Sequence, residues 1–240
     1  MVALPPIERW SVQANLRPLG GGSRNAVFRT VGLLQDIVFK TTDRSDAALD
    51  WLEAVYDAAE AAGLIVPRLI RSQQGALSEA GWTAEPFLEG QVIPEEDIGR
   101  LKPLMERFHK LSNRLAQRPG YLSAYDLLKA NAGGDVDFTE MPTSVVSACR
   151  AAFAALDTPE MTVIHGDLNT SNVLQVNLGG IALLDWDEAR RDHPAFDMAQ
   201  LSPATQKEAL ACLAWEVACC WSKEPDRARN LAAELMARTS

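Results

Sequence analysis

Two short segments in the second half of the chain carry the residue types that can do chemistry. HGDLNTSNVL (165–174) contains an Asp followed five residues later by an Asn, and LLDWDE (183–188) places another Asp after an apolar stretch. At this spacing a carboxylate can orient an acceptor hydroxyl while an amide binds metal on the other side of one phosphoryl group. Oxygen atoms are the ligands that Mg²⁺ prefers. The pattern therefore indicates phosphoryl transfer, with Asp167, Asn172 and Asp185 in these roles.

A purely structural interpretation of these residues competes with the chemical one. Asp and Asn are common in turns, where their side chains bond to nearby backbone groups, and Asp167 or Asn172 taken alone fits that description. His165, Gly166 and Asp197 accompany this pair at the separations expected of a phosphoryl-transfer site. The combination favours chemistry over turn formation.

The two segments, read on through Asp197, resemble the catalytic loop and metal segment of the aminoglycoside phosphotransferase and choline kinase-like family. That family also includes homoserine and fructosamine kinases and shares the protein-kinase fold. The resemblance implies that Asp167 is the catalytic base and that Asn172 and Asp185 bind Mg²⁺. It implies that His165 braces the catalytic loop, that Asp197 supports it, and that ATP or GTP is the phosphoryl donor. Its specificity rests on this segment, and the match extends more weakly over most of the chain.

A lysine near the end of an apolar stretch, Lys40 in IVFK, corresponds to the strand lysine that pairs with the α- and β-phosphates in such kinases. A lysine at a strand end is otherwise a common solvated residue. The resemblance implies an acidic partner on the helix that follows. Glu53 fits the family spacing best, although Asp46 and Asp50 lie near the same helical face and remain open.

The glycine-rich segment GGGSRN (20–25) departs from both common phosphate-loop patterns. It lacks the GK[ST] ending of a Walker A motif, and Asn25 stands where a third glycine would complete GxGxxG. Members of the family often show a Gly, Ser, Asn loop here. We expect backbone N–H groups, Ser23 and Asn25 to cover the triphosphate, and a simple flexible turn is the alternative.

The segment AEPFLEG (84–90) occupies the place of the hinge between two lobes. By analogy with cleft sites at domain interfaces, the backbone groups of Glu85 and Phe87 would read the adenine or guanine edge. A rigid connector without ligand contacts is the alternative. We interpret His109 as a packing residue and His193 as a loop residue. Asp187 and Glu188 are left outside the catalytic set, because exposed acids are usually solvated.

The elements that would position these residues begin with a β-rich region. AVFRTV (26–31) and QDIVFKT (35–41) are typical of strands joined by a hairpin turn. The stretch from Ser45, an N-cap candidate, to Gly63, a C-terminal stop, has the apolar spacing of an amphipathic helix. Two more strands are predicted near 67–72 and 81–87, before Gly90 and Pro94 break the pattern.

The remainder of the chain is predicted to be mostly helical. We expect helices near 95–117, 142–156, 203–221 and 225–238. Between Met161 and Leu184, three short apolar runs alternate with turn-rich segments, which indicates strands that present loops to a cleft. The expected fold is α+β and protein-kinase-like, with a nucleotide-binding lobe over 1–90 and a helical lobe with the catalytic loop and acceptor site over 91–240.

The amino-acid composition limits the classes of binding partner that we expect. The chain has 240 residues, with 23 Lys plus Arg against 32 Asp plus Glu and a net charge of −9. A nucleic-acid partner is not expected, because such binding needs clustered positive charge. No apolar run approaches a membrane span and the N-terminus lacks a signal peptide pattern, so we expect a cytoplasmic protein without a membrane partner. The four cysteines lie in Ala-rich helical stretches and are expected to be reduced core residues.

These observations together favour a kinase that acts on a small molecule. The acceptor would be a hydroxyl of a small compound, such as an aminoglycoside or an amino alcohol, and the negative net charge would mildly favour a cationic one. A catalytically silent nucleotide-binding protein of the same fold is one alternative. A protein-substrate kinase is another, disfavoured by HGD in place of HRD and by the lack of DFG and APE segments. The acceptor's identity and the oligomeric state are not determined by the sequence.

Overall fold

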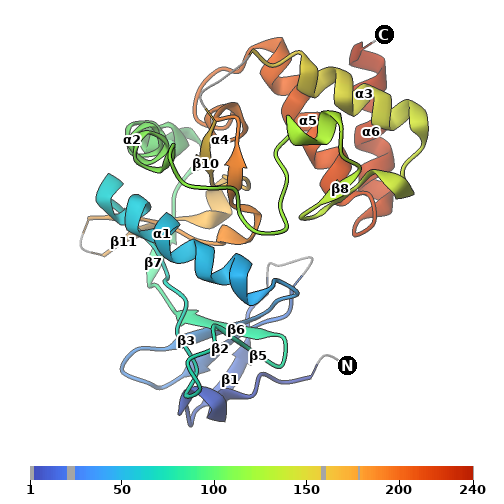
Figure 1. The fold of residues 1–240 in the computed structure, drawn as a ribbon. Helices are drawn as coiled ribbons and strands as arrows, with labels where there is room; N and C mark the ends of the chain where they lie inside the picture. The colour runs from blue at the N-terminus through green and yellow to red at the C-terminus, as the bar shows by residue number, and fades with distance from the viewer. Residues whose placement is uncertain (1–2, 21–24, 158–160, 178, 240) are drawn as a thin grey trace.

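A five-stranded antiparallel sheet forms the N-terminal end of the molecule, shown in blue and green in Figure 1. The computed structural model describes residues 3–20, 25–157, 161–177 and 179–239. The strand order is β1-β2-β3-β6-β5. The strands are β1 (Asn15–Pro18), β2 (Val27–Val31), β3 (Ile37–Thr41), β5 (Ser78–Glu79) and β6 (Trp82–Pro86). One face packs Phe39, Trp82 and Ala84 against Trp10 of the short 3₁₀ helix η1 (Ile7–Trp10).

The sequence predicted most of this sheet. The strands expected at 26–31, 35–41 and 81–87 are confirmed as β2, β3 and β6. The prediction of a strand at 67–72 is wrong, because this segment forms none of the strands of the sheet. That segment is joined to β6 by a backbone hydrogen bond in which the Ile70 N–H donates to the Ala84 carbonyl at 2.7 Å. Its arginines, Arg68 and Arg71, turn toward acids of the preceding helix.

Helix α1 (Asp46–Ala62) lies between the N-terminal sheet and the rest of the molecule (Figure 1). Its ends are those the sequence predicts. The Ser45 side chain accepts from the Ala48 N–H, which satisfies one of the free donors of the first turn, and Gly63 ends the helix at φ 99°. Its apolar residues, including Leu52 and Val55, are buried in a core shared with α2.

A second sheet, of four short strands, carries the segments that hold the candidate site. Its order is β4-β12-β11-β7, with β4 parallel to β12 and the other pairs antiparallel. The strands are β4 (Leu64–Ile65), β7 (Gly90–Val92), β11 (Val173–Val176) and β12 (Ile181–Leu183). Two separate pairs join β10 (Thr162–Ile164) to β13 (Arg190–Asp192) and β8 (Ala132–Gly133) to β9 (Val136–Asp137). The three strands predicted between Met161 and Leu184 are confirmed as β10, β11 and β12.

Helices form the C-terminal end of the molecule, opposite the five-stranded sheet (Figure 1). The α-helices are α2 (Lys102–Ser112), α3 (Thr143–Ala154), α4 (Ala195–Met198), α5 (Gln206–Cys220) and α6 (Pro225–Thr239). The 3₁₀ helices are η2 (Glu95–Leu101), η3 (Asp126–Leu128), η4 (Phe138–Glu140), η5 (Thr170–Asn172) and η6 (Trp186–Glu188). The four predicted helices are present, but the first begins as η2 and ends at Ser112. Helices α3, α5 and α6 share a core that contains Cys149 and Trp215.

The four cysteines are free thiols, and three of them are buried. Burial raises the pKa of Cys149 to about 12, as expected of a thiol in an apolar core. Among the described residues, no helix combines the length and apolar character that a membrane crossing requires.

Candidate active site

The catalytic-loop candidate, residues 165–172, connects β10 to β11. Hydrogen bonds to the Asp197 carboxylate hold the start of this loop in place. The Asp197 carboxylate accepts from the backbone N–H groups of His165 at 2.9 Å and Gly166 at 3.0 Å, and His109 Nε2 donates to it at 2.9 Å. Asp197 is completely buried. Burial raises its pKa, but the hydrogen bond from His109 and the neighbouring donors outweigh burial and hold the pKa below its usual range. An ionised Asp197 therefore fixes the start of the loop, with His109 packed beneath it.

His165 joins the loop to the segment that follows β12. Its Nε2 donates to the Leu184 carbonyl at 2.8 Å, and its ring packs edge-on against Trp186 with centroids 4.8 Å apart. The side chain is buried. His165 thus lies in a bracing position and does not reach the open side of the loop.

Asp167 and Asn172 face each other across the loop. The Asn172 amide nitrogen donates to the Asp167 carbonyl at 2.9 Å and to its carboxylate Oδ2 at 3.0 Å. Asn169 donates to the other carboxylate oxygen at 3.0 Å. These bonds orient an exposed carboxylate. They also use the amide nitrogen of Asn172, which leaves its amide oxygen available to a cation.

Backbone pairing places Asp185 at the same end of the β11–β12 hairpin as Asn172. The register pairs Val173 with Leu183, and the Leu184 N–H continues it by donating to the Asn172 carbonyl at 2.8 Å. Asp185 follows directly, with a left-handed φ of 60° that is uncommon outside glycine and often marks functional positions. The hairpin therefore brings the catalytic-loop candidate and the candidate metal-binding residue Asp185 to the same end of the sheet.

Lys40 connects this cluster to the N-terminal sheet. Its ammonium lies 2.5 Å from Asp185 Oδ1 and 2.8 Å from Asp187 Oδ2. Burial opposes the charged form of Lys40, but Asp187 and Asp185 outweigh it and raise the pKa above its usual value. Asn25, at the end of the glycine-rich segment, also donates to Asp187 at 3.1 Å. Ser23 lies outside the described residues.

The donor set of this cluster fits a divalent cation of the Mg²⁺ type. The Asn172 amide and the Asp185 carboxylate offer oxygen atoms, the ligands that Mg²⁺ takes from proteins, usually one or two at a time with substrate phosphates completing its shell. Among the described residues no group of three or more His, Cys, Asp or Glu side chains could hold a metal by itself. The remaining ligands of a cation held by Asn172 and Asp185 would be substrate phosphates and water.

Comparison with known protein families identifies the family to which the chain belongs. Residues 15–214 match the sequence model of the Phosphotransferase enzyme family. The chain belongs to the phosphotransferase enzyme family. The match spans most of the chain, and it confirms both the resemblance seen in the catalytic segments and the predicted enzyme class.

Solved structures of phosphotransferases share the fold over nearly the whole chain. One is a thermostable mutant of aminoglycoside phosphotransferase APH(4)-Ia in a ternary complex with AMP-PNP and hygromycin B, 19% identical, with a TM-score of 0.62 and 97% of this chain and 94% of that one covered. Choline kinase LicA from Streptococcus pneumoniae is 13% identical (TM-score 0.63, coverage 95% and 94%). Macrolide 2'-phosphotransferase MphH from Brachybacterium faecium is 16% identical (TM-score 0.59, coverage 95% and 94%). The expected protein-kinase-like fold is confirmed.

The structure corrects the expected partner of Lys40. Glu53 contacts Arg68 at 3.3 Å and Arg71 at 3.7 Å, whereas Lys40 pairs with Asp185 and Asp187. The physical reason is the pair of arginines just after α1, which draws Glu53 away from the cleft. The prediction of a Lys40–Glu53 pair is therefore wrong for this structure, and Asp187, left out of the catalytic set above, belongs to the cluster.

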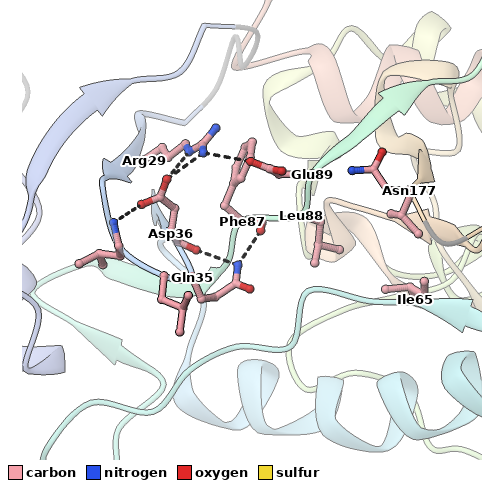
Figure 2. A pocket seen from close by; sticks show the side chains of 11 residues that line it. Arg29, Gln35, Asp36, Ile65, Phe87, Leu88, Glu89 and Asn177 are labelled. Carbon is pink, nitrogen blue, oxygen red and sulfur yellow. Dashed lines mark hydrogen bonds and ion pairs between the residues drawn. The ribbon is translucent and has the colours of Figure 1, made fainter.

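In the hinge candidate, the backbone of Phe87 is hydrogen-bonded within the protein. A cavity of about 460 Å³ lies beside residues 87–89, and the Arg29 guanidinium lies 3.4 Å from the centroid of the Phe87 ring. Figure 2 shows the side chains that line this cavity. The Phe87 N–H donates to the Asp36 carbonyl at 2.8 Å, and its carbonyl accepts from Gln35 Nε2 at 2.8 Å. Both backbone groups of Phe87 thus have protein partners in this structure, and the expectation that backbone groups of Glu85 and Phe87 read a base edge stays a prediction.

Glu85, the other hinge residue, lies deeper. Its side chain lines the small cavity that contains Lys40 and Asp185. Burial raises the pKa of its carboxyl to about 8, with Lys40 acting in the opposite direction. The sequence analysis predicts a role for the Glu85 backbone, whereas in the structure its side chain lines the cavity beside Lys40.

Two residues that the sequence analysis did not identify donate hydrogen bonds to backbone carbonyls of the segment that follows Asp185. Arg118 is 1% exposed and donates to the carbonyls of Asp187 at 2.8 Å and Ala189 at 3.2 Å, and to that of Ala48 in α1 at 3.1 Å. The Tyr121 hydroxyl donates to the same Asp187 carbonyl at 2.9 Å. No motif marks either residue, because their targets are backbone carbonyls that any sequence provides.

Proposed function

We propose that this phosphotransferase is a small-molecule kinase that transfers the γ-phosphoryl group of ATP or GTP to a hydroxyl of a small acceptor, such as an aminoglycoside or an amino alcohol. The observation that carries the proposal is an unbroken series of contacts. Lys40 pairs with Asp185, the residue before Asp185 bonds to Asn172, and the amide of Asn172 bonds to Asp167. This series supports the proposal that Lys40 binds phosphate, that Asn172 and Asp185 bind the metal, and that Asp167 is the base of one reaction.

Asp167 is the residue suited to orient the acceptor. Its carboxylate is exposed, and each oxygen already accepts one amide bond, from Asn172 and from Asn169. Lone pairs remain on both oxygens for an incoming hydroxyl. Asp167 would hold that hydroxyl in line with the γ-phosphorus and accept its proton as the bond forms.

Asn172 and Asp185 would hold Mg²⁺, which supplies neutralisation of the charge on the transferred phosphoryl group when bound. Lys40 would bind the α- and β-phosphates, and Asn25 with the backbone around it would cover them from the glycine-rich side. In this assignment residues 1–90 form the nucleotide-binding lobe. Residues 91–240 provide the catalytic loop and the acceptor site.

The names of the related structures support an acceptor that is small and hydroxylated. They include a complex with hygromycin B, a choline kinase and a macrolide phosphotransferase. The net charge of −9 favours the approach of a cationic compound by long-range attraction. Amino alcohols and aminoglycosides combine both properties.

A mass-shift screen of the purified protein tests this function. Hydroxylated amines, sugars and antibiotics would each be incubated with Mg²⁺ and either ATP or GTP, beside a panel of Ser- and Thr-containing peptides. We expect one class of small compound to gain a phosphoryl group, and EDTA to abolish the gain. Phosphorylation confined to peptides would contradict the small-molecule assignment, and failure to bind either nucleotide would contradict the kinase assignment.

A further inference from the structure

All five acids of helix α1 are engaged with the segment that follows the helix. Each contacts a residue in the segment 68–78, at distances from 2.6 to 3.7 Å. These contacts join Arg68 to Glu53, Asp57 and Glu60, Arg71 to Asp50 and Glu53, and Ser78 to Asp46. The acids of α1 therefore have partners other than Lys40.

The residues of α1 that line a cavity together with Lys40 are apolar. Leu49, Leu52 and Tyr56 line the same small cavity as Lys40, and all three are buried. Their spacing of three and four residues is that of one helical face. In this structure α1 therefore presents apolar side chains to the cavity of Lys40, while its acids pair elsewhere.

Strand β6 supplies an acid to that cavity in place of the helix. The register of β3 and β6 pairs Lys40 with Thr83 and Val38 with Glu85. Side chains two residues apart point to the same face of a strand, so Glu85 and Lys40 lie on one face of the sheet. Both line the cavity, together with Asp185 and Asp187. Among the residues that the structure describes, none donates a hydrogen bond to the Glu85 carboxyl.

The present partners of Lys40 are also those that a bound nucleotide would disturb. Asp185 contacts Lys40 at 2.5 Å and is the carboxylate proposed to hold Mg²⁺. Asp187 shares its Oδ2 between Lys40 and Asn25. When a cation takes the Asp185 oxygen, Lys40 loses one of two carboxylates and keeps Asp187, which it shares with Asn25, and Glu85 is the acid in the cavity that can take the vacated place.

We propose that Glu85 is the positioning residue for Lys40, holding its ammonium toward the α- and β-phosphates in place of an acid from helix α1. The inference rests on the proposed function, because it concerns the nucleotide-bound state of that site. Glu85 itself contacts neither phosphate nor acceptor. Its effect passes through Lys40 and should depend on phosphates, not on the nucleobase.

Binding measurements on isosteric variants separate this role from a structural one. The dissociation constants of Mg-ATP, Mg-GTP and adenosine would be measured by calorimetry for the wild type, Glu85→Gln, Glu85→Asp and the control Glu53→Gln. Loss of a charge-assisted hydrogen bond weakens an interaction by roughly tenfold or more. We expect Glu85→Gln to weaken Mg-ATP and Mg-GTP alike by about tenfold, to leave adenosine unchanged, and to be partly rescued in Glu85→Asp. Glu53→Gln should bind all three ligands as the wild type does.

Each alternative result has a distinct meaning. Wild-type affinity of Glu85→Gln for Mg-ATP would overturn the role of Glu85 while leaving the proposed function intact. An equal loss for adenosine and Mg-ATP would also overturn it, because Glu85 would then act on the base or on the fold. A wild type that binds no Mg-nucleotide would overturn the proposed function and this role together.

Discussion

The amide nitrogen of Asn172 lies 3.0 Å from the Asp167 carboxylate and donates a hydrogen bond to it. One side chain thereby serves two purposes in the site. Its nitrogen orients the candidate base, and its oxygen is left for a cation beside Asp185. The relationship makes the position of the base depend on the same residue that would hold the metal.

Replacement of Asn172 by Ala should therefore affect both functions. We expect turnover to fall by about a hundredfold or more, as for other losses of base positioning, and the Mg²⁺ concentration for half-maximal activity to rise. Titration of Mg²⁺ at saturating nucleotide measures both. Asn169→Ala is the matched control, because Asn169 also bonds to Asp167 but offers nothing to the metal. An equal shift in the Mg²⁺ requirement of both variants would contradict the assignment of Asn172.

Gly166 is expected to tolerate no side chain. Its φ is 86°, and an added Cβ would lie 2.6 Å from the Glu188 carbonyl oxygen. Gly32 has a similar φ of 95° but open space around it. Gly32→Ala should lose about 1 kcal/mol of unfolding free energy from backbone conformation alone, and Gly166→Ala should lose roughly 1 to 3 kcal/mol more from the clash and the strain. Urea denaturation measures the free energy of unfolding of both variants. Equal losses would contradict the prediction, because they would show that the residues around Gly166 move aside for a Cβ at no cost.

The buried guanidinium of Arg118 should control the metal segment. Arg118→Lys removes most of the hydrogen bonds to the carbonyls of residues 187 and 189, so we expect a weaker response to Mg²⁺ and a loss of about 2 to 3 kcal/mol in stability. Arg150→Lys is the control. Arg150 also binds two carbonyls, of Leu127 and Ala130, but away from the site. Destabilisation without a change in Mg²⁺ response is expected for Arg150→Lys alone, and the same pattern in Arg118→Lys would refute its link to the metal segment.

Asp135 should make stability depend on acid pH. It pairs with Arg44, just before α1, at 2.6 Å and with Lys223, just after α5, at 2.8 Å. Burial raises its pKa, but Arg44 and Lys223 outweigh burial and lower it to about 2. The folded pKa lies below the ordinary value of about 3.9. The stabilisation is thus complete above about pH 4 and is lost as pH falls through about 2, by roughly 2 kcal/mol in total.

Denaturation of Asp135→Asn between pH 6 and about pH 2 tests this sign. The variant should be less stable than the wild type near neutral pH and should lose less stability as the pH falls. Asp226→Asn, at an exposed position of α6, should keep the wild-type slope. A wild-type slope in Asp135→Asn would show that the pair does not contribute as argued.

The sequence predicted those parts of the fold that local patterns specify. Ser45 and Gly63 bracket α1 because capping side chains and a left-handed glycine act within a few residues. The Asp167, Asn172 and Asp185 pattern could be recognised because a loop and a hairpin bring these residues together over a short stretch. The partner of Glu53 could not, because Arg68 and Arg71 reach it from a segment that resembles a strand but pairs with α1.

Contacts made by backbone atoms also escaped prediction. Arg118 and Tyr121 act on carbonyl groups of residues 187 and 189, for which no side-chain motif exists. The side chain of Glu85 was overlooked because only the strand register reveals that it shares a face with Lys40. Such relationships depend on tertiary packing, which periodicity and spacing do not encode.

The most direct test of the account is single-turnover phosphoryl transfer by Asp167→Asn with an acceptor found in the screen. We expect the rate of transfer to fall by about a thousandfold or more, with Mg-nucleotide affinity within about twofold of the wild type because the lost interaction belongs to the reaction step. The control Asp226→Asn should transfer at the wild-type rate. A folded Asp167→Asn protein that transfers as fast as the wild type would contradict the central claim.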